Sequence, residues 1–202
     1  MKQQFVETIK IKDGKVVNLS CHQVRMEKTI NHFFPDLAQR AMPCLKELIK
    51  PRKDMDFVKA RVVYGMEGVE LIEYIPYSIR NIKSLQIVYN DTIEYEYKST
   101  DRSALNKLVA DKGACDEIII VKNGYITDTS FTNLAIFDSG EWIPPKRPLL
   151  YGTKRASLLD KRLIKEADIT LDVLRKACKV RLFNAMIEFG EIEIDVKHIT
   201  MW

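Results

Sequence analysis

The chain has 202 residues, which is enough to bury a sizeable core in one compact domain or in two small lobes. With 46% hydrophobic and 30% charged residues, the composition excludes disorder, a collagen-like repeat and a coiled-coil rod. The apolar runs are too short to span a bilayer and no signal peptide is evident, so we expect no membrane association. The net charge of +4 is well mixed along the chain, which argues against a nucleic-acid groove and suits a small anionic ligand.

The first half of the chain predicts strands interrupted by a few helices. An alternating segment at 5–11 predicts a strand, and Asp13-Gly14 predicts a hairpin turn after it. Ser20 is a candidate cap for a helix over 23–34, and Pro35 follows this helix. Further helices are expected at 45–50 and from 101 to about 110. Four runs rich in β-branched and aromatic residues predict strands: 57–64, 69–76, 84–89 and 93–97.

The second half continues with short strands and two helices. Asn123-Gly124 predicts a hairpin turn, and Thr170 is a candidate helix cap. The expected strands are 117–121, 125–127, 133–137, 141–143, 180–183 and 187–194, and the expected helices are 153–167 and 171–178. Because strands and helices are grouped rather than strictly alternating, the order of elements predicts an α+β fold.

The cysteines and histidines give no sign of a structural metal site. None of them lies at the spacing of metal ligands, and there is no CxxC pair. We therefore expect no bound metal and reduced thiols, as in the cytoplasm. The residues in question are Cys21, Cys44, Cys115, Cys178, His22, His32 and His198.

One lysine stands out by its position. Lys98 follows the aromatic run at 95–97 and comes directly before the expected helix start at 99–101. A lysine held there and desolvated would have a lowered pKa and could attack a carbonyl. On position alone, a solvated lysine at a strand end is the simpler interpretation, because most lysines are exposed.

Residues 117–137 read EIIIVKNGYITDTSFTNLAIF and resemble the central signature of the class IV aminotransferase family, the fold-type IV pyridoxal-phosphate (PLP) enzymes. That signature is a strand, an Asn-Gly turn, an acidic residue, a Ser, and then Asn at the start of the next strand. The resemblance covers nearly the whole chain. Four further matches follow the order of the family: FVETIK at 5–10 with Asp13-Gly14, HQVR at 22–25, PLLYGTKR at 148–155 and NAM at 184–186.

The resemblance implies the two-lobed α+β fold of the fold-type IV enzymes, which is like that of D-amino acid aminotransferase. A smaller N-terminal α/β lobe would span 1–97, and a larger PLP-binding lobe would span 98–202. Family members normally carry a further strand and turn before the segment that matches 5–10, so we expect a truncated N-terminal lobe. Since that missing segment normally borders the substrate, its absence would affect the choice of substrate more than the binding of the cofactor.

The resemblance also implies PLP as the cofactor and assigns two reactive residues. Lys98 matches the lysine that binds the PLP aldehyde covalently and later moves the substrate proton. Asp128 stands where the family usually has Glu, opposite the pyridine nitrogen, and a carboxylate there would keep that nitrogen protonated. Without the resemblance, Asp128 would be read as a turn residue.

The phosphate of PLP has its own implied ligands. Arg25 matches the phosphate arginine of the family, although by itself it would be read as a solvated helix residue. Thr153 and Lys154 begin a helix, where backbone amides favour an anion. Ala185 and Met186 match a second turn that contacts the phosphate. Candidate contacts to the substrate are Thr8, Arg61, Arg80 and Arg102, and the sequence does not choose among the three arginines.

The family resemblance leaves three functions open. The segment at 184–186 and the run from Lys98 to Arg102 favour an aminodeoxychorismate lyase, which releases 4-aminobenzoate and pyruvate. The alternatives are an aminotransferase of the branched-chain or D-amino acid type and a non-catalytic relative. A small anionic amine or an amino acid is the implied substrate, and a homodimer is the implied assembly.

Overall fold

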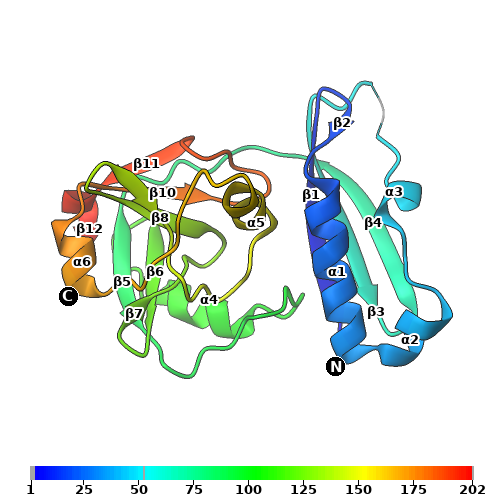
Figure 1. Cartoon of the computed structure of the whole chain (residues 1–202), viewed down its shortest axis with the longest axis horizontal. Coiled ribbons are helices and arrows are strands. Elements are labelled where there is room, and N and C mark those ends of the chain that lie inside the picture. Colours follow the sequence, from blue (N-terminus) through cyan, green and yellow to red (C-terminus); the bar gives the residue numbers. More distant parts are fainter. Residues whose placement is uncertain (1–2, 52, 202) are drawn as a thin grey trace. The chain divides into compact units, whose positions relative to one another are not determined.

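The computed structural model describes residues 3–51 and 53–201, and the chain divides into two compact units. The first unit contains residues up to Ile79 together with Tyr97–Asp101. The second unit contains Arg80–Glu96 and the residues from Arg102 onward. Figure 1 shows the first unit mainly in blue and cyan and the second in green to red. Both units combine helices with sheets, which confirms the expected α+β class.

The division differs from a boundary between residues 97 and 98. The strand at Leu85–Tyr89 pairs with the strand at Glu117–Lys122, so the preceding loop and this strand belong to the second unit. Tyr97–Asp101 instead joins the first unit, because the backbone of Val6 bonds to that of Lys98. A single cut in the sequence therefore cannot separate the units.

The first unit is an antiparallel sheet with helices. Its strand order is β2-β1-β3-β4, and helix α1 contacts β1 (Figure 1). The turn between β1 and β2 has positive φ at both Asp13 and Gly14, as a two-residue hairpin requires. Buried apolar side chains such as Ile9, Met26 and Ala60 fill its core. The bounds are β1 Phe5–Lys12, β2 Lys15–Val16, α1 Leu19–Phe33, α2 Pro35–Arg40, α3 Leu45–Leu48, β3 Phe57–Gly65 and β4 Gly68–Pro76.

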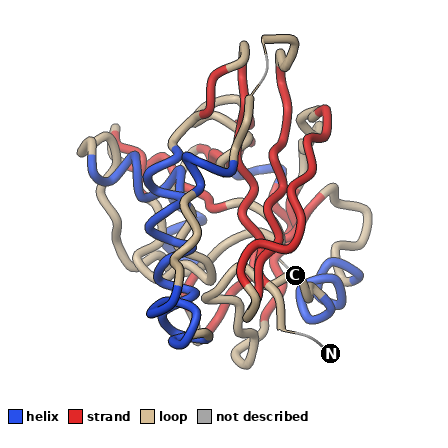
Figure 2. The backbone as a smooth tube through the Cα atoms, turned by 90° about the vertical axis from the view of Figure 1, so that its right-hand side faces the viewer, coloured by secondary structure: helices blue, strands red, loops and turns tan. Residues whose placement is uncertain are grey.

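The described part of the second unit contains two four-stranded sheets. One is antiparallel with the order β11-β10-β8-β9, and the other has the order β12-β5-β6-β7, in which β5 is parallel to both of its neighbours. Figure 2 shows the strands of both units in red and the helices in blue. The bounds are β5 Leu85–Tyr89, α4 Ser103–Ala110, β6 Glu117–Lys122, β7 Tyr125–Ile126, β8 Asn133–Asp138, β9 Glu141–Ile143, α5 Thr153–Asp160, α6 Leu171–Lys176, β10 Lys179–Phe183, β11 Ile192–Asp195, the 3-10 turn η1 Val196–His198 and β12 Ile199–Thr200.

One prediction about helix ends is wrong and two are confirmed. Helix α1 begins after Asn18, whose φ is 56°, so Ser20 lies inside the helix rather than at its cap. Pro35 follows the end of that helix as expected, and it also begins α2, where its missing N–H costs nothing at the first helical position. Thr170 does cap α6, because its side chain accepts a hydrogen bond from the Val173 amide.

Three expected elements differ most from the structure, while the helices expected at 45–50 and 171–178 and the strand expected at 125–127 are one or two residues shorter than predicted. The run 93–97 forms no strand. The ring of Tyr97 packs against the core of the first unit, and the backbone of the run does not join a sheet. The helix from Thr153 ends at Asp160, shortly before Arg162 with its φ of 55°. The last long strand begins only at Ile192, because Gly190 has a φ of 115°.

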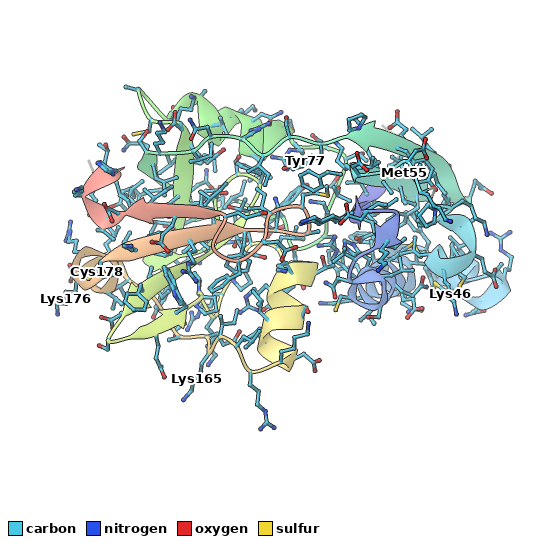
Figure 3. The ribbon with its side chains drawn as sticks, turned by 90° about the horizontal axis from the view of Figure 1, so that it is seen from above. Lys46, Met55, Tyr77, Lys165, Lys176 and Cys178 are labelled. Carbon is cyan, nitrogen blue, oxygen red and sulfur yellow. The ribbon has the colours of Figure 1, made fainter. Side chains whose placement is uncertain are left out.

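None of the helices in the described ranges is long and apolar enough to cross a membrane. All four cysteines are free thiols. Cys178, labelled in Figure 3 beside Lys176, is exposed.

Candidate active site

The Lys98 segment is attached to the beginning of β1. The Val6 amide donates to the Lys98 carbonyl over 2.9 Å, and the Thr100 amide donates to the Gln4 carbonyl over 3.0 Å. Phe5 and Ser99 form an isolated β-bridge between these two hydrogen bonds. Lys98 is therefore held on β1 by its backbone, and its side chain is only partly exposed. The backbone from which the amine of Lys98 extends is therefore fixed, which favours a defined position for a reacting group.

Tyr97 anchors the same segment through its ring. The ring stacks on His32 at 4.9 Å between centroids and meets the edge of Phe33 at 4.8 Å. Phe5 lies 6.4 Å away in an edge-on arrangement. Since aromatic pairs in such geometries add stability beyond the area that they bury, Tyr97 fixes the residue just before Lys98.

A buried cluster of charges lies on the neighbouring part of the first unit. The side chains of Glu7 and His22 are fully buried, and Nδ1 of His22 lies 2.6 Å from Oε2 of Glu7. Arg25 donates to the same carboxylate through Nε at 2.9 Å and through Nη2 at 2.6 Å. Glu7 therefore orients His22 and Arg25, the first and last residues of the HQVR segment.

The pKa values define the charges in this cluster. Burial raises the pKa of Glu7, but the charge of Arg25 and the hydrogen bonds from His22 and Arg25 outweigh it and lower that pKa to about 2. Burial lowers the pKa of His22, and the charges of Arg25 and Lys98 lower it further. His22 is therefore neutral at neutral pH. Because an ionised Glu7 only accepts, the proton of His22 must be on Nδ1, which leaves Nε2 as an acceptor.

Asp128, the acid that the family resemblance places opposite the pyridine nitrogen, is buried in the second unit. Oδ1 of Asp128 accepts from Asn133 Nδ2 at 2.8 Å, and Oδ2 accepts from the Leu150 amide at 2.9 Å. Asn133 Nδ2 also donates to the Leu150 carbonyl at 2.9 Å. Burial raises the pKa of Asp128 to about 6, against the hydrogen bonds and the charge of Arg155. Asp128 is thus a desolvated carboxylate that a positive group beside it would stabilise.

The same group of hydrogen bonds around Asp128 and Asn133 positions the start of α5. Gly152 precedes Thr153 and lies against Asn133, so closely that a Cβ at Gly152 would overlap with the amide oxygen of Asn133. Glycine at this position therefore allows the N-terminus of α5 to approach the partner of Asp128. The first amides of a helix have no intrahelical acceptor, and they favour an anion.

Gly152→Ala should destabilise the protein by about 1–3 kcal/mol, because the added methyl group would displace Asn133 and weaken its bond to Asp128. The backbone of Gly152, with φ of −68°, accepts any residue, so the effect comes from the overlap alone. Urea unfolding measures it. Ala156→Ser, which adds one atom at an exposed position of the same helix, is the control. Equal stability of both variants would contradict the packing described above.

The loop from Asp128 to Asn133 connects several elements of the second unit. Ser130 donates from its hydroxyl to Glu117 Oε2 at 3.0 Å, and Arg102 Nη2 donates to the Ser130 carbonyl at 2.8 Å. Asn184 Nδ2 donates to the Phe131 carbonyl at 3.1 Å. The loop therefore links the acid, the start of α4 and the turn after β10.

The structure divides the expected site residues between the units. Lys98, Arg25, Thr8 and Arg61 belong to the first unit, where Thr8 and Arg61 are register partners on β1 and β3. The second unit contains Asp128, Thr153, Lys154, Ala185, Met186, Arg80 and Arg102.

Several of these residues already have partners within their own unit. Lys154 pairs with Glu188, and the Met186 amide donates to Asn184 Oδ1 at 2.8 Å. The guanidinium of Arg25 uses Nε and Nη2 for Glu7. Arg61 pairs with Glu73 at 2.8 Å.

Three supporting residues were not identified from the sequence. Glu7, Glu117 and Asn133 are buried, and each bonds to a residue or loop of the candidate site. The sequence feature that could have identified them is a polar residue inside, or at the start of, an otherwise apolar strand. Such a residue needs a buried hydrogen-bond partner.

These features define a class of protein: a two-unit α+β chain with a fixed lysine, a buried charge cluster and a separate buried acid. The profile described as "Amino-transferase class IV" matches residues 4–193. The chain belongs to the class IV aminotransferase family.

Individual relatives agree with this assignment. The crystal structure of a candidate 4-amino-4-deoxychorismate lyase from Haemophilus somnus is 32% identical, with a TM-score of 0.82 over 93% of this chain and 98% of that one. An uncharacterised protein of Haemophilus influenzae is 36% identical over 89% of this chain and 96% of its own length. A candidate aminodeoxychorismate lyase of Schizosaccharomyces pombe is 25% identical over 86% of this chain and 82% of its own.

Each unit by itself has groups of the types that PLP needs. The first unit has a lysine on a segment that is held by its backbone and an arginine suited to a phosphate, and the second has a helix start and a desolvated carboxylate. A protonated pyridine nitrogen would supply the positive group that Asp128 needs. The chemistry of the residues therefore fits the cofactor of the resemblance.

Proposed function

We propose that this protein is a PLP-dependent enzyme that acts as an aminodeoxychorismate lyase. The likeness to the Haemophilus somnus protein carries the proposal, because it extends over almost the whole of both chains at 32% identity. The fixed Lys98 and the buried Asp128 supply the two groups that such chemistry needs.

Each residue has a role that its chemistry supports. Lys98 would bind the aldehyde carbon of PLP, and Asp128 would accept the N–H of its pyridine ring. Arg25 and the amides at the start of α5 would bind its phosphate, together with the turn at Ala185 and Met186. When bound, PLP withdraws electrons from the substrate carbon that bears the amine.

The reaction needs a base and a leaving group. With PLP bound, the free amine of Lys98 would remove the proton from the ring carbon that bears the substrate nitrogen. The bond between the ring carbon and the enolpyruvyl oxygen would then break, and the proton held by Lys98 would pass to the methylene carbon of the departing enolate, so that pyruvate leaves and the ring becomes aromatic. Asp128 keeps its negative charge opposite the ring nitrogen throughout.

The test incubates the purified protein, loaded with PLP, with aminodeoxychorismate and measures 4-aminobenzoate and pyruvate in equal amounts. Amino acids that convert the bound PLP to its amine form, with no 4-aminobenzoate produced, would instead indicate an aminotransferase. A protein that forms no covalent PLP adduct would indicate a non-catalytic relative.

Asp128→Asn should lower the turnover by about 10²-fold or more, because a neutral amide no longer holds the proton on the pyridine nitrogen. Asp128→Glu, which restores the usual residue of the family, should retain more activity than Asp128→Asn. Asp160→Asn, at the exposed end of α5, is the matched control. Turnover of Asp128→Asn within a few-fold of the control would remove this role, provided that thermal unfolding shows the variant to be folded.

We also propose a homodimer and a cytoplasmic location. The four free thiols suit a reducing compartment. Light scattering on the PLP-loaded protein tests the dimer, and a monomer that is fully active would contradict it.

A further inference from the structure

Two arginines meet the loop that follows Asp128. The guanidinium of Arg80 lies over the ring of Phe131 at 4.9 Å, and Nη2 of Arg102 donates to the carbonyl of Ser130 at 2.8 Å. Ser130 and Phe131 are consecutive, and both lie between Asp128 and its partner Asn133. The loop thus brings two cations to the segment that holds the candidate acid.

The charges of these arginines are not neutralised by a carboxylate in the described part of the chain. Neither Arg80 nor Arg102 forms an ion pair there, whereas Arg61, the third candidate of the sequence, is paired with Glu73. Arg147 offers a comparison within the second unit. It lies over Tyr125 at 4.3 Å in a similar way, but Asp168 neutralises it at 3.0 Å.

The geometry of both arginines leaves donors available. Arg80 is held at Phe131 by its charge over the ring, and among the residues that the structure describes it makes no side-chain hydrogen bond, so its N–H groups remain able to bind a carboxylate in a bidentate way. The hydrogen bond to Ser130 uses one N–H of Arg102 and fixes the orientation of the others. Arg102 also lies 5.8 Å from the ring of Tyr95.

From this we infer that Arg80 and Arg102 form a subsite for a dicarboxylate, in which each guanidinium binds one carboxylate of the substrate. The inference rests on the proposed function and narrows it: the enzyme selects ring acids with two carboxylates over amino acids with one. Aminodeoxychorismate has one carboxylate on its ring and another on its enolpyruvyl group, as this subsite requires.

The test measures binding, so it does not depend on turnover. Isothermal titration of the PLP-loaded protein compares 3-(carboxymethoxy)benzoate, which has two carboxylates, with 3-methoxybenzoate, which has one. The diacid should bind at least about tenfold more tightly, because each charge-assisted bidentate contact is worth about that factor or more. Arg80→Met and Arg102→Met should each remove most of this preference, and Arg147→Met should preserve it.

A second variant covers the case in which Arg102→Met does not fold after losing its bond to Ser130. Arg102→Lys retains the charge and should show a smaller loss of the preference for the diacid. Arg80 is exposed, so its replacement by Met is expected to leave the fold intact.

In turnover, Arg80→Met should raise KM for aminodeoxychorismate more than it lowers kcat, as the loss of a binding contact does.

The outcomes separate the two proposals. A lyase whose arginine variants bind the diacid as the wild type does would overturn the subsite and leave the proposed function intact. A wild-type protein that binds both probes equally would also overturn the subsite. A diacid preference that depends on both arginines, in a protein that forms no 4-aminobenzoate, would support the subsite and reject the proposed reaction.

Discussion

Lys98→Ala should abolish the covalent attachment of PLP and lower the turnover by about 10³-fold or more, because the same amine binds the cofactor and moves the substrate proton. The variant should remain folded, since Lys98 is tied to β1 through its backbone carbonyl, which alanine retains. The visible absorbance of the bound cofactor and mass spectrometry after borohydride reduction measure the attachment. Steady-state release of 4-aminobenzoate measures the turnover.

Lys107→Ala is the matched control for this experiment, because Lys107 is exposed on helix α4 of the second unit. The reduced PLP adduct should be found on the peptide that contains Lys98 in the wild type and in the control, and should be missing in Lys98→Ala. An adduct on another lysine, or turnover of Lys98→Ala near that of the control, would refute the assignment of the reactive amine.

Glu7→Gln should lower the free energy of unfolding at pH 7 by about 3–5 kcal/mol, because it leaves the charge of Arg25 without its buried partner. Glu73→Gln is the matched control. Glu73 also pairs with an arginine, Arg61, on the sheet of the first unit, but its side chain is 41% exposed. An exposed pair of this kind contributes about 1 kcal/mol or less. Urea unfolding of both variants measures the difference.

The pH dependence gives the same pair of variants a second test. The pKa of Glu7 is lowered from 4.5 to about 2 in the folded protein, so the folded state binds fewer protons than the unfolded state between these values. The stability that this provides is complete above about pH 4.5 and is lost as the pH falls through 2, by about 3 kcal/mol in total. Wild type and Glu73→Gln should lose it on acidification. If Glu7→Gln lost a similar amount of stability on acidification, the pH dependence would come from groups other than Glu7.

The local patterns of the sequence predicted most elements of the fold. The Asp13-Gly14 turn, the strand that begins at Phe5 and the Thr170 cap depend on neighbouring residues, so local reasoning succeeds for them. The run 93–97 failed for the opposite reason. Its aromatic residues favour a strand, but Tyr97 packs between His32 and Phe33, residues that are distant in the chain.

The sequence by itself determined the family, because five short motifs in a fixed order carry the resemblance and the profile match confirms it. Only the tertiary structure decided what supports the candidate residues. Glu7 joins His22 to Arg25, Asn133 joins Asp128 to the start of α5, and two arginines meet one loop. Such contacts join residues far apart in sequence, and a buried carboxylate selects its partners by distance and desolvation, which no spacing along the chain encodes.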